Sequence, residues 1–140
     1  PLNKVASGGE LARTSLALQA TLAKHIDIPT LIFDEIDVGI GGKTAAVVGK
    51  LLQKLSYSHQ VICITHQPQV AASGQHHWVV SKTYPNQKQN KTKNNNLSTE
   101  VSINYLDQEQ RINEIARMLS GIETTESTIN HAKEMLAMLE

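Results

Sequence analysis

Two short strings in this sequence carry residues that could act on a phosphate. Ser7-Gly8-Gly9-Glu10 stands where apolar residues begin to recur at helical spacing. A helix N-terminus offers backbone N–H groups to an anion, and bare glycines let a bulky phosphate come close. Further along, the apolar residues 30–33 lead into Asp34-Glu35. Paired carboxylates at a strand end can hold Mg²⁺ and orient an attacking water. Together the two strings predict part of a nucleotide-hydrolysing site.

Each string also has a purely structural interpretation. Ser7 and Glu10 form a capping box, in which each side chain bonds a backbone N–H at the start of the helix. A capping box does not explain Gly8 and Gly9, since a glycine within a helix costs about 1 kcal/mol relative to alanine. Asp34 and Glu35 could likewise simply begin a loop. The phosphate hypothesis therefore depends on what lies beside them.

The predicted elements bring a third group to the same place. Periodicity predicts a helix over residues 8–25, a buried strand over 30–33, a helix over 43–55 and a second buried strand over 61–65. A strand-helix-strand unit of this length is right-handed with parallel strands, whose carboxyl ends share one edge of the sheet. We therefore expect Asp34, Glu35 and His66 to converge at the edge where α/β sheets bind ligands.

The second half of the sequence predicts a hairpin and three helices. A short helix is expected over 68–72, strands over 78–81 and 98–105, and helices over 108–119 and 126–139. The connection over 82–97 is rich in lysine and asparagine. A solvated hairpin loop is its simpler interpretation, and contact with a phosphate backbone is the alternative.

Composition restricts the class of protein. With 140 residues, 40% apolar and 19% charged, the chain is typical of one globular domain. Its net charge of zero argues against nucleic-acid binding through bulk electrostatics. Cys63 is the single cysteine, so an intramolecular disulfide is excluded and a reducing cytosol is expected. There is no membrane-span pattern or signal peptide. The start at Pro1 suggests a piece of a longer protein.

The motifs resemble those of ABC-type ATPases. Ser7-Gly8-Gly9-Glu10 resembles their signature motif, residues 31–35 their Walker B strand, Asp37 their D-loop acid and His66 their switch histidine. Residues 34–45, 65–71 and 114–121 are similar to the SMC-like branch that serves bacterial DNA double-strand-break repair and recombination. The resemblance implies an α/β fold: the C-terminal lobe of a P-loop NTPase head, one domain over residues 1–140. Mainly parallel core strands would be flanked by helices and followed by an antiparallel hairpin and two helices.

The resemblance also implies a mechanism and partners. Asp34 would hold Mg²⁺, Glu35 would position the attacking water, and His66 would contact the γ-phosphate of the same head. Ser7, Gly8, Gly9 and Glu10 would bind, in trans, the ATP held by a second head of a homodimer, with Asp37 at the dimer seam. An N-terminal lobe with the Walker A loop and a coiled coil would complete the protein. DNA would be bound through the complete, cytoplasmic and nucleoid-associated protein, without a membrane.

Several alternatives remain open at this point. Gly42-Lys43-Thr44 ends like a Walker A loop, but the position that needs its first glycine holds Asp37, which favours a flexible D-loop and helix start instead. A transporter motor would usually have proline after the Walker B glutamate, where Ile36 stands. A non-catalytic dimerisation module is the third possibility. The fragment alone is expected not to hydrolyse ATP. A zinc site could also be formed by Cys63, His66, His76 and His77. It is disfavoured because His76 and His77 are adjacent, and adjacent residues of a strand point to opposite faces, so the two cannot easily bind one ion.

Overall fold

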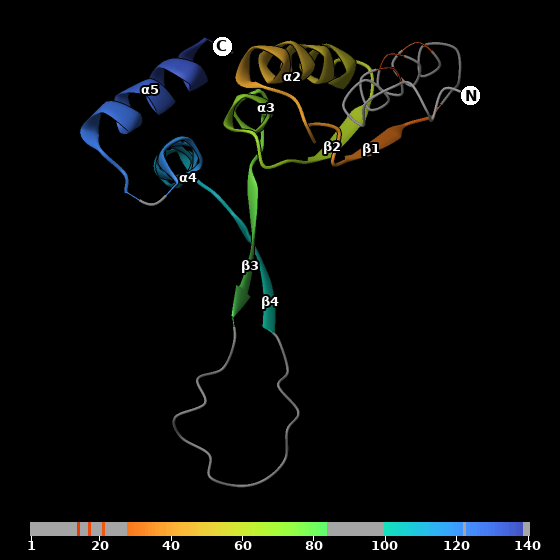
Figure 1. The fold of residues 1–140 in the computed structure, drawn as a ribbon. Coiled ribbons are helices and arrows are strands. Elements are labelled where there is room, and N and C mark those ends of the chain that lie inside the picture. The colour runs from red at the N-terminus through yellow and green to blue at the C-terminus, as the bar shows by residue number, and fades with distance from the viewer. Residues whose placement is uncertain are drawn as a thin grey trace, which may run out of the picture.

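The fold is seen in a computed structural model of the 140-residue chain (Figure 1). It describes residues 28–83, 100–121 and 123–138, together with Thr14, Ala17 and Thr21. The expected helix over 8–25, apart from those three positions, lies outside the described residues. So do the signature-like string at 7–10 and residues 84–99 of the lysine- and asparagine-rich connection.

A parallel βαβ unit forms the part of the fold that carries Asp34 and His66. Strand β1 (Thr30–Asp34) leads through α2 (Gly42–Ser56) to strand β2 (Gln60–Ile64). The strands pair in parallel with Thr30 opposite Gln60 and Asp34 opposite Ile64. The expected parallel unit is confirmed, with element ends within one residue of the sequence prediction.

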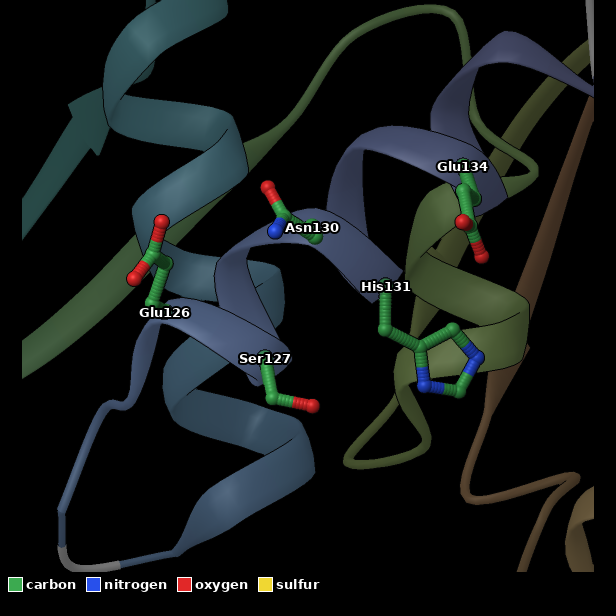
Figure 2. Close-up of a pocket in the computed structure, with 5 residues that line it drawn as sticks. All are labelled: Glu126, Ser127, Asn130, His131 and Glu134. Atoms are coloured by element: carbon green, nitrogen blue, oxygen red, sulfur yellow. The ribbon is translucent and has the colours of Figure 1, made fainter.

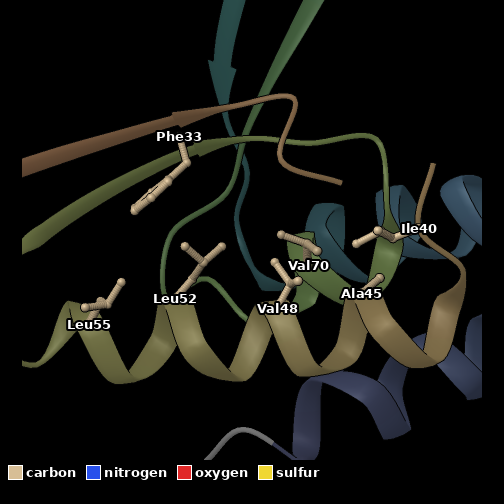
Figure 3. Packing of buried hydrophobic residues seen from close by; sticks show 7 residues of the cluster. All are labelled: Phe33, Ile40, Ala45, Val48, Leu52, Leu55 and Val70. Atoms are coloured by element: carbon tan, nitrogen blue, oxygen red, sulfur yellow. The ribbon is translucent and has the colours of Figure 1, made fainter. Parts of the chain in front are cut away.

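One face of this small sheet is covered and the other is exposed. Phe33 on β1 packs on the apolar stripe of α2, whose members recur at intervals of three and four residues as an amphipathic helix requires (Figure 3). The core consists of Phe33, Ile40, Ala45, Val48, Leu52, Leu55 and Val70. On the opposite face, Ile32, Ile62 and Ile64 are 66%, 45% and 56% exposed. A strand alternates its side chains between faces, so these isoleucines line the face that α2 does not reach.

The remaining elements form a hairpin and a helical layer. Strands β3 (Trp78–Thr83) and β4 (Glu100–Tyr105) pair antiparallel and extend away from the body (Figure 1). Helix α3 (Pro68–Ala72) packs on α2, while α4 (Gln108–Ser120) packs on α5 (Glu126–Ala137) around a second apolar cluster. The expected hairpin and three helices are confirmed, with ends that differ by no more than two residues. No helix in the described ranges is long and apolar enough to cross a membrane.

Arg111 of α4 links this helix to the end of α3. Its guanidinium donates hydrogen bonds to the carbonyl oxygens of Ala72, at 2.7 Å, and of Gly74 and Gln75, just beyond the end of α3. Ala72 is the last residue of α3 and the other two carbonyls lie beyond it, so none has a partner within the helix, and a planar cation is suited to bind several of them at once. Arg111 thereby fixes where α3 ends relative to α4.

The close packing of α2 on α3 depends on a glycine. A Cβ at Gly49 would overlap Ser73 Oγ and come within 3.0 Å of the Gln69 carbonyl oxygen. We expect Gly49→Ala to lower the free energy of unfolding by about 1–3 kcal/mol through overpacking, even though alanine favours a helix. Gly41→Ala is the matched control, because a Cβ there meets nothing within 4 Å and φ is −86°. Urea denaturation of both variants measures the difference; equal stability would contradict the close α2–α3 contact.

Candidate functional site

The carboxyl ends of β1 and β2 lie together at one edge of the sheet. Asp34 ends β1 directly opposite Ile64, so Glu35 and the Thr65-His66 pair leave the sheet side by side. The side chains of Asp34 and Glu35 are exposed, and that of His66 is 64% exposed. At the level of the backbone, this is the convergence that the parallel unit predicts. It leaves two carboxylates and an imidazole accessible at the edge where α/β folds bind ligands.

Glu35 has an unusual backbone conformation. Its φ is 53°, in the left-handed region that a residue other than glycine adopts at a cost of about 1–2 kcal/mol. The Val38 N–H donates to the Glu35 carbonyl at 3.2 Å and closes a tight turn, and Gly39 is also left-handed with φ 72°. Conformations of this kind are concentrated at functional sites, where the surrounding structure holds them in place. The strain lies on the residue that the sequence marks for chemistry.

The structure places Asp37 inside the chain. Its side chain is 0% exposed, and its Oδ2 atom accepts hydrogen bonds from the Thr65 hydroxyl and, at 3.1 Å each, from the backbone N–H groups of His66 and Gln67. His66 Nδ1 also lies 3.4 Å from Oδ2. The resemblance had implied that this acid would face a partner at a dimer seam. In this single chain the carboxylate is engaged by donors of its own chain, and the position of Asp37 at a dimer seam stays a prediction.

Thr65 and Gln67 are site residues that the sequence analysis did not single out. The Gln67 side-chain amide donates to the Ile40 carbonyl at 3.3 Å and lies 3.5 Å from His66 Nε2. The Gln67 N–H is also 3.0 Å from Thr65 Oγ1. One signal was present in the sequence: Asp37 is flanked by Ile36 and Val38, an apolar setting in which a buried acid needs several donors.

The four residues considered for zinc do not form a site. His76 Nδ1 lies 3.4 Å from the Tyr105 hydroxyl, while the pKa of His77 is lowered by burial and by the nearby charge of Arg111. Within the described ranges, no group of three or more histidine, cysteine, aspartate or glutamate side chains is placed to hold a metal ion.

Cys63 lies in β2, one residue before the end of the strand. Burial is the main cause that raises the pKa of its thiol to about 12, and the negative charges of Asp37 and Asp34 contribute less. We expect iodoacetamide to alkylate the folded protein at pH 8 roughly a thousandfold more slowly than the urea-unfolded chain, because the thiolate is the nucleophile. The same shift lowers the free energy of unfolding as pH rises from 9 toward 12, where only the unfolded state loses the thiol proton. Equal alkylation rates in the two states, measured by mass spectrometry, would contradict this environment.

A shallow hollow on the outer surface of α5 lies apart from this edge (Figure 2). All of its lining residues come from one helix: Glu126, Ser127, Asn130, His131 and Glu134. None of them is a residue that the sequence analysis assigned to chemistry.

The relatives found by comparison with known proteins share one name. No protein-family model matches the chain. Three relatives named DNA repair protein RecN cover nearly all of it: 56% identity over 97% of the chain in Vibrio cholerae, 49% over 99% in Haemophilus influenzae and 42% over 97% in Halalkalibacterium halodurans. The chain spans only 22–23% of the length of these curated relatives.

A solved structure shares the fold. It comes from a description of ATP-driven dimerization and DNA-stimulated activation of SMC ATPases, and it matches with a TM-score of 0.57 over 84% of this chain and 64% of that one. Sequence identity to it is 21%, so this likeness speaks for the α/β architecture alone. With 42–56% identity along almost its whole length, the chain is similar to a segment of RecN proteins that makes up about a quarter of their length.

Proposed function

We propose that this chain is the C-terminal lobe of an SMC-like ATPase head, and that the longer protein binds and hydrolyses ATP in the repair and recombination of DNA double-strand breaks. The observation that best supports this proposal is that Asp34-Glu35 and Thr65-His66 directly follow two paired parallel strands and so lie at the same edge of the sheet. Two kinds of likeness support it: the relatives are named DNA repair proteins, and the fold is that of an SMC ATPase chain.

The reaction is phosphoryl transfer to water, and each residue at the edge has a role in it. Glu35 orients the attacking water and accepts its proton, while the exposed imidazole of His66 contacts the γ-phosphate. Asp34 offers an exposed carboxylate, the hard oxygen ligand that Mg²⁺ prefers. Bound there, Mg²⁺ would neutralise charge on the phosphates. The string Ser7 to Glu10 would bind the nucleotide of a second head.

The partners proposed for this lobe follow from the exposed apolar face of its β1–β2 sheet. Parallel sheets are covered on both faces in folded proteins, yet Ile32, Ile62 and Ile64 are exposed here. We assign this isoleucine face to an N-terminal lobe of the same protein, which would also supply the phosphate-binding Walker A loop. A second head would complete a homodimer across bound ATP, and DNA would be bound by the complete protein.

The test compares the 140-residue chain with a protein of the length of its relatives that contains it. Only the longer protein is expected to hydrolyse ATP in the presence of Mg²⁺. Lys43→Ala should leave its turnover unchanged, since Lys43 stands exposed in the first turn of α2 rather than in a phosphate-binding loop. Turnover by the short chain that Lys43→Ala abolishes would overturn the proposal. Absence of turnover in the longer protein would instead favour a non-catalytic dimerisation module.

A further inference from the structure

We propose that Asp37 is a positioning residue, which ties the turn carrying Glu35 to the segment carrying His66 within a single head. The inference rests on the proposed function, because it gives Asp37 a role in the same reaction. It also replaces the seam position with a role inside the chain. The observation behind it is a fully buried carboxylate that holds two adjoining segments of the candidate site.

On one side, Asp37 fixes the residues around His66. Its Oδ2 atom accepts from the Thr65 hydroxyl and from the successive N–H groups of His66 and Gln67. These residues lie between the end of β2 and the start of α3, where neither strand nor helix supplies partners for their N–H groups. Without Asp37, the part-buried Thr65 hydroxyl and His66 N–H would lose this acceptor, and the Gln67 N–H would keep only Thr65 Oγ1. The backbone position of His66 therefore depends directly on this carboxylate.

On the other side, Asp37 belongs to the same turn as Glu35. Within the turn, Val38 N–H donates to the Glu35 carbonyl and Ile40 N–H donates to the Asp37 carbonyl at 3.3 Å. Gln67 closes the arrangement from the opposite segment by donating to the Ile40 carbonyl. The strained φ of Glu35 is thus held by a turn whose middle residue is locked into the 65–67 segment. One buried carboxylate sets the position of both the Glu35 and the His66 backbone.

The contacts suggest two informative substitutions. Only Oδ2 carries hydrogen bonds, while Oδ1 is buried with no partner among the described residues. Asp37→Asn keeps one oxygen where Oδ2 lies but loses the charge, whereas Asp37→Ala removes the acceptor altogether. Asp107 provides a matched control: it is also an aspartate that accepts from a backbone N–H, that of Gln110, at 2.8 Å, but at the start of α4.

The experiment measures ATP turnover in the protein of the length of its relatives. We expect Asp37→Ala to lower kcat about tenfold or more while KM changes less than about threefold, because misplaced catalytic groups impair the chemical step more than binding. Asp37→Asn should recover a substantial part of kcat. Asp107→Ala should leave kcat unchanged. A kcat for Asp37→Ala equal to that of the unmodified protein would overturn the proposal.

A second measurement separates this role from the dimer seam. In a Glu35→Gln background, ATP-dependent dimerisation by size-exclusion chromatography should survive Asp37→Asn. Loss of the dimer in the double variant alone would return Asp37 to the seam and overturn the proposal. If Glu35→Gln alone hydrolyses ATP normally, the proposed function fails instead. Hydrogen exchange at the His66 and Gln67 amides then still tests whether Asp37 holds this segment: faster exchange in Asp37→Ala supports it, and unchanged exchange contradicts it.

Discussion

Glu35→Gln is expected to lower ATP turnover by about 10²–10³-fold in a protein of the length of the RecN relatives, while ATP still binds. Glutamine is nearly isosteric with glutamate, so the strained turn at φ 53° and the buried contacts of Asp37 remain in place. What is lost is the carboxylate that accepts the proton of the attacking water. The variant should therefore stop at the ATP-bound state, in which two heads share the nucleotides between them.

The measurement is steady-state phosphate release together with the oligomeric state in the presence of ATP. Turnover should fall and an ATP-dependent dimer should accumulate. Glu109→Gln is the matched control, because this exposed glutamate lies in the first turn of α4, away from the sheet edge. If Glu35→Gln releases phosphate as fast as the unmodified protein, Glu35 is not the catalytic carboxylate and the assignment of the site fails.

The regular elements could be predicted because their signals are local. The apolar run of β1 and the helical spacing of Ala46, Val47, Leu51 and Leu55 each lie within a few adjacent turns of chain. The structure confirms the helix, but its buried face carries Ala45, Val48, Leu52 and Leu55, and Val47 is 67% exposed. The order strand, helix, strand then implies a parallel pair, and from that pair the meeting of Asp34 and His66 at one edge follows. The described strands and helices, and the meeting of Asp34 and His66 at one edge of the sheet, were therefore accessible from the sequence.

The environment of Asp37 was not accessible in the same way. An aspartate in a turn usually faces water, whereas Asp37 is buried. The groups that donate hydrogen bonds to it belong to residues 65–67, which are distant along the chain. The left-handed φ of Glu35 is likewise imposed by its surroundings, since its residue type does not favour that conformation. Both features arise from tertiary contacts. One concerns Glu35, to which we assign the chemistry, and the other concerns Asp37, to which we assign the positioning of Glu35 and His66.

Ile32→Asp is expected to have the second largest effect, and only in the longer protein. In the 140-residue chain Ile32 is 66% exposed on the uncovered face of the sheet, so the aspartate stays hydrated and the free energy of unfolding should change by less than about 1 kcal/mol. If an N-terminal lobe covers this face, the charge becomes buried without a partner. That costs several kcal/mol, enough to prevent assembly of the head or to unfold it.

Val47→Asp is the control for this substitution. Val47 is 67% exposed, almost the same as Ile32, but it lies on the outer side of α2 rather than on the isoleucine face. Soluble yield, thermal unfolding and ATP turnover of the longer protein should fall sharply with Ile32→Asp and change little with Val47→Asp. Equal behaviour of the two variants would mean that the isoleucine face stays in water. The proposed N-terminal lobe would then have to join this chain elsewhere, and the edge carrying Asp34, Glu35 and His66 would need another source for its phosphate-binding loop.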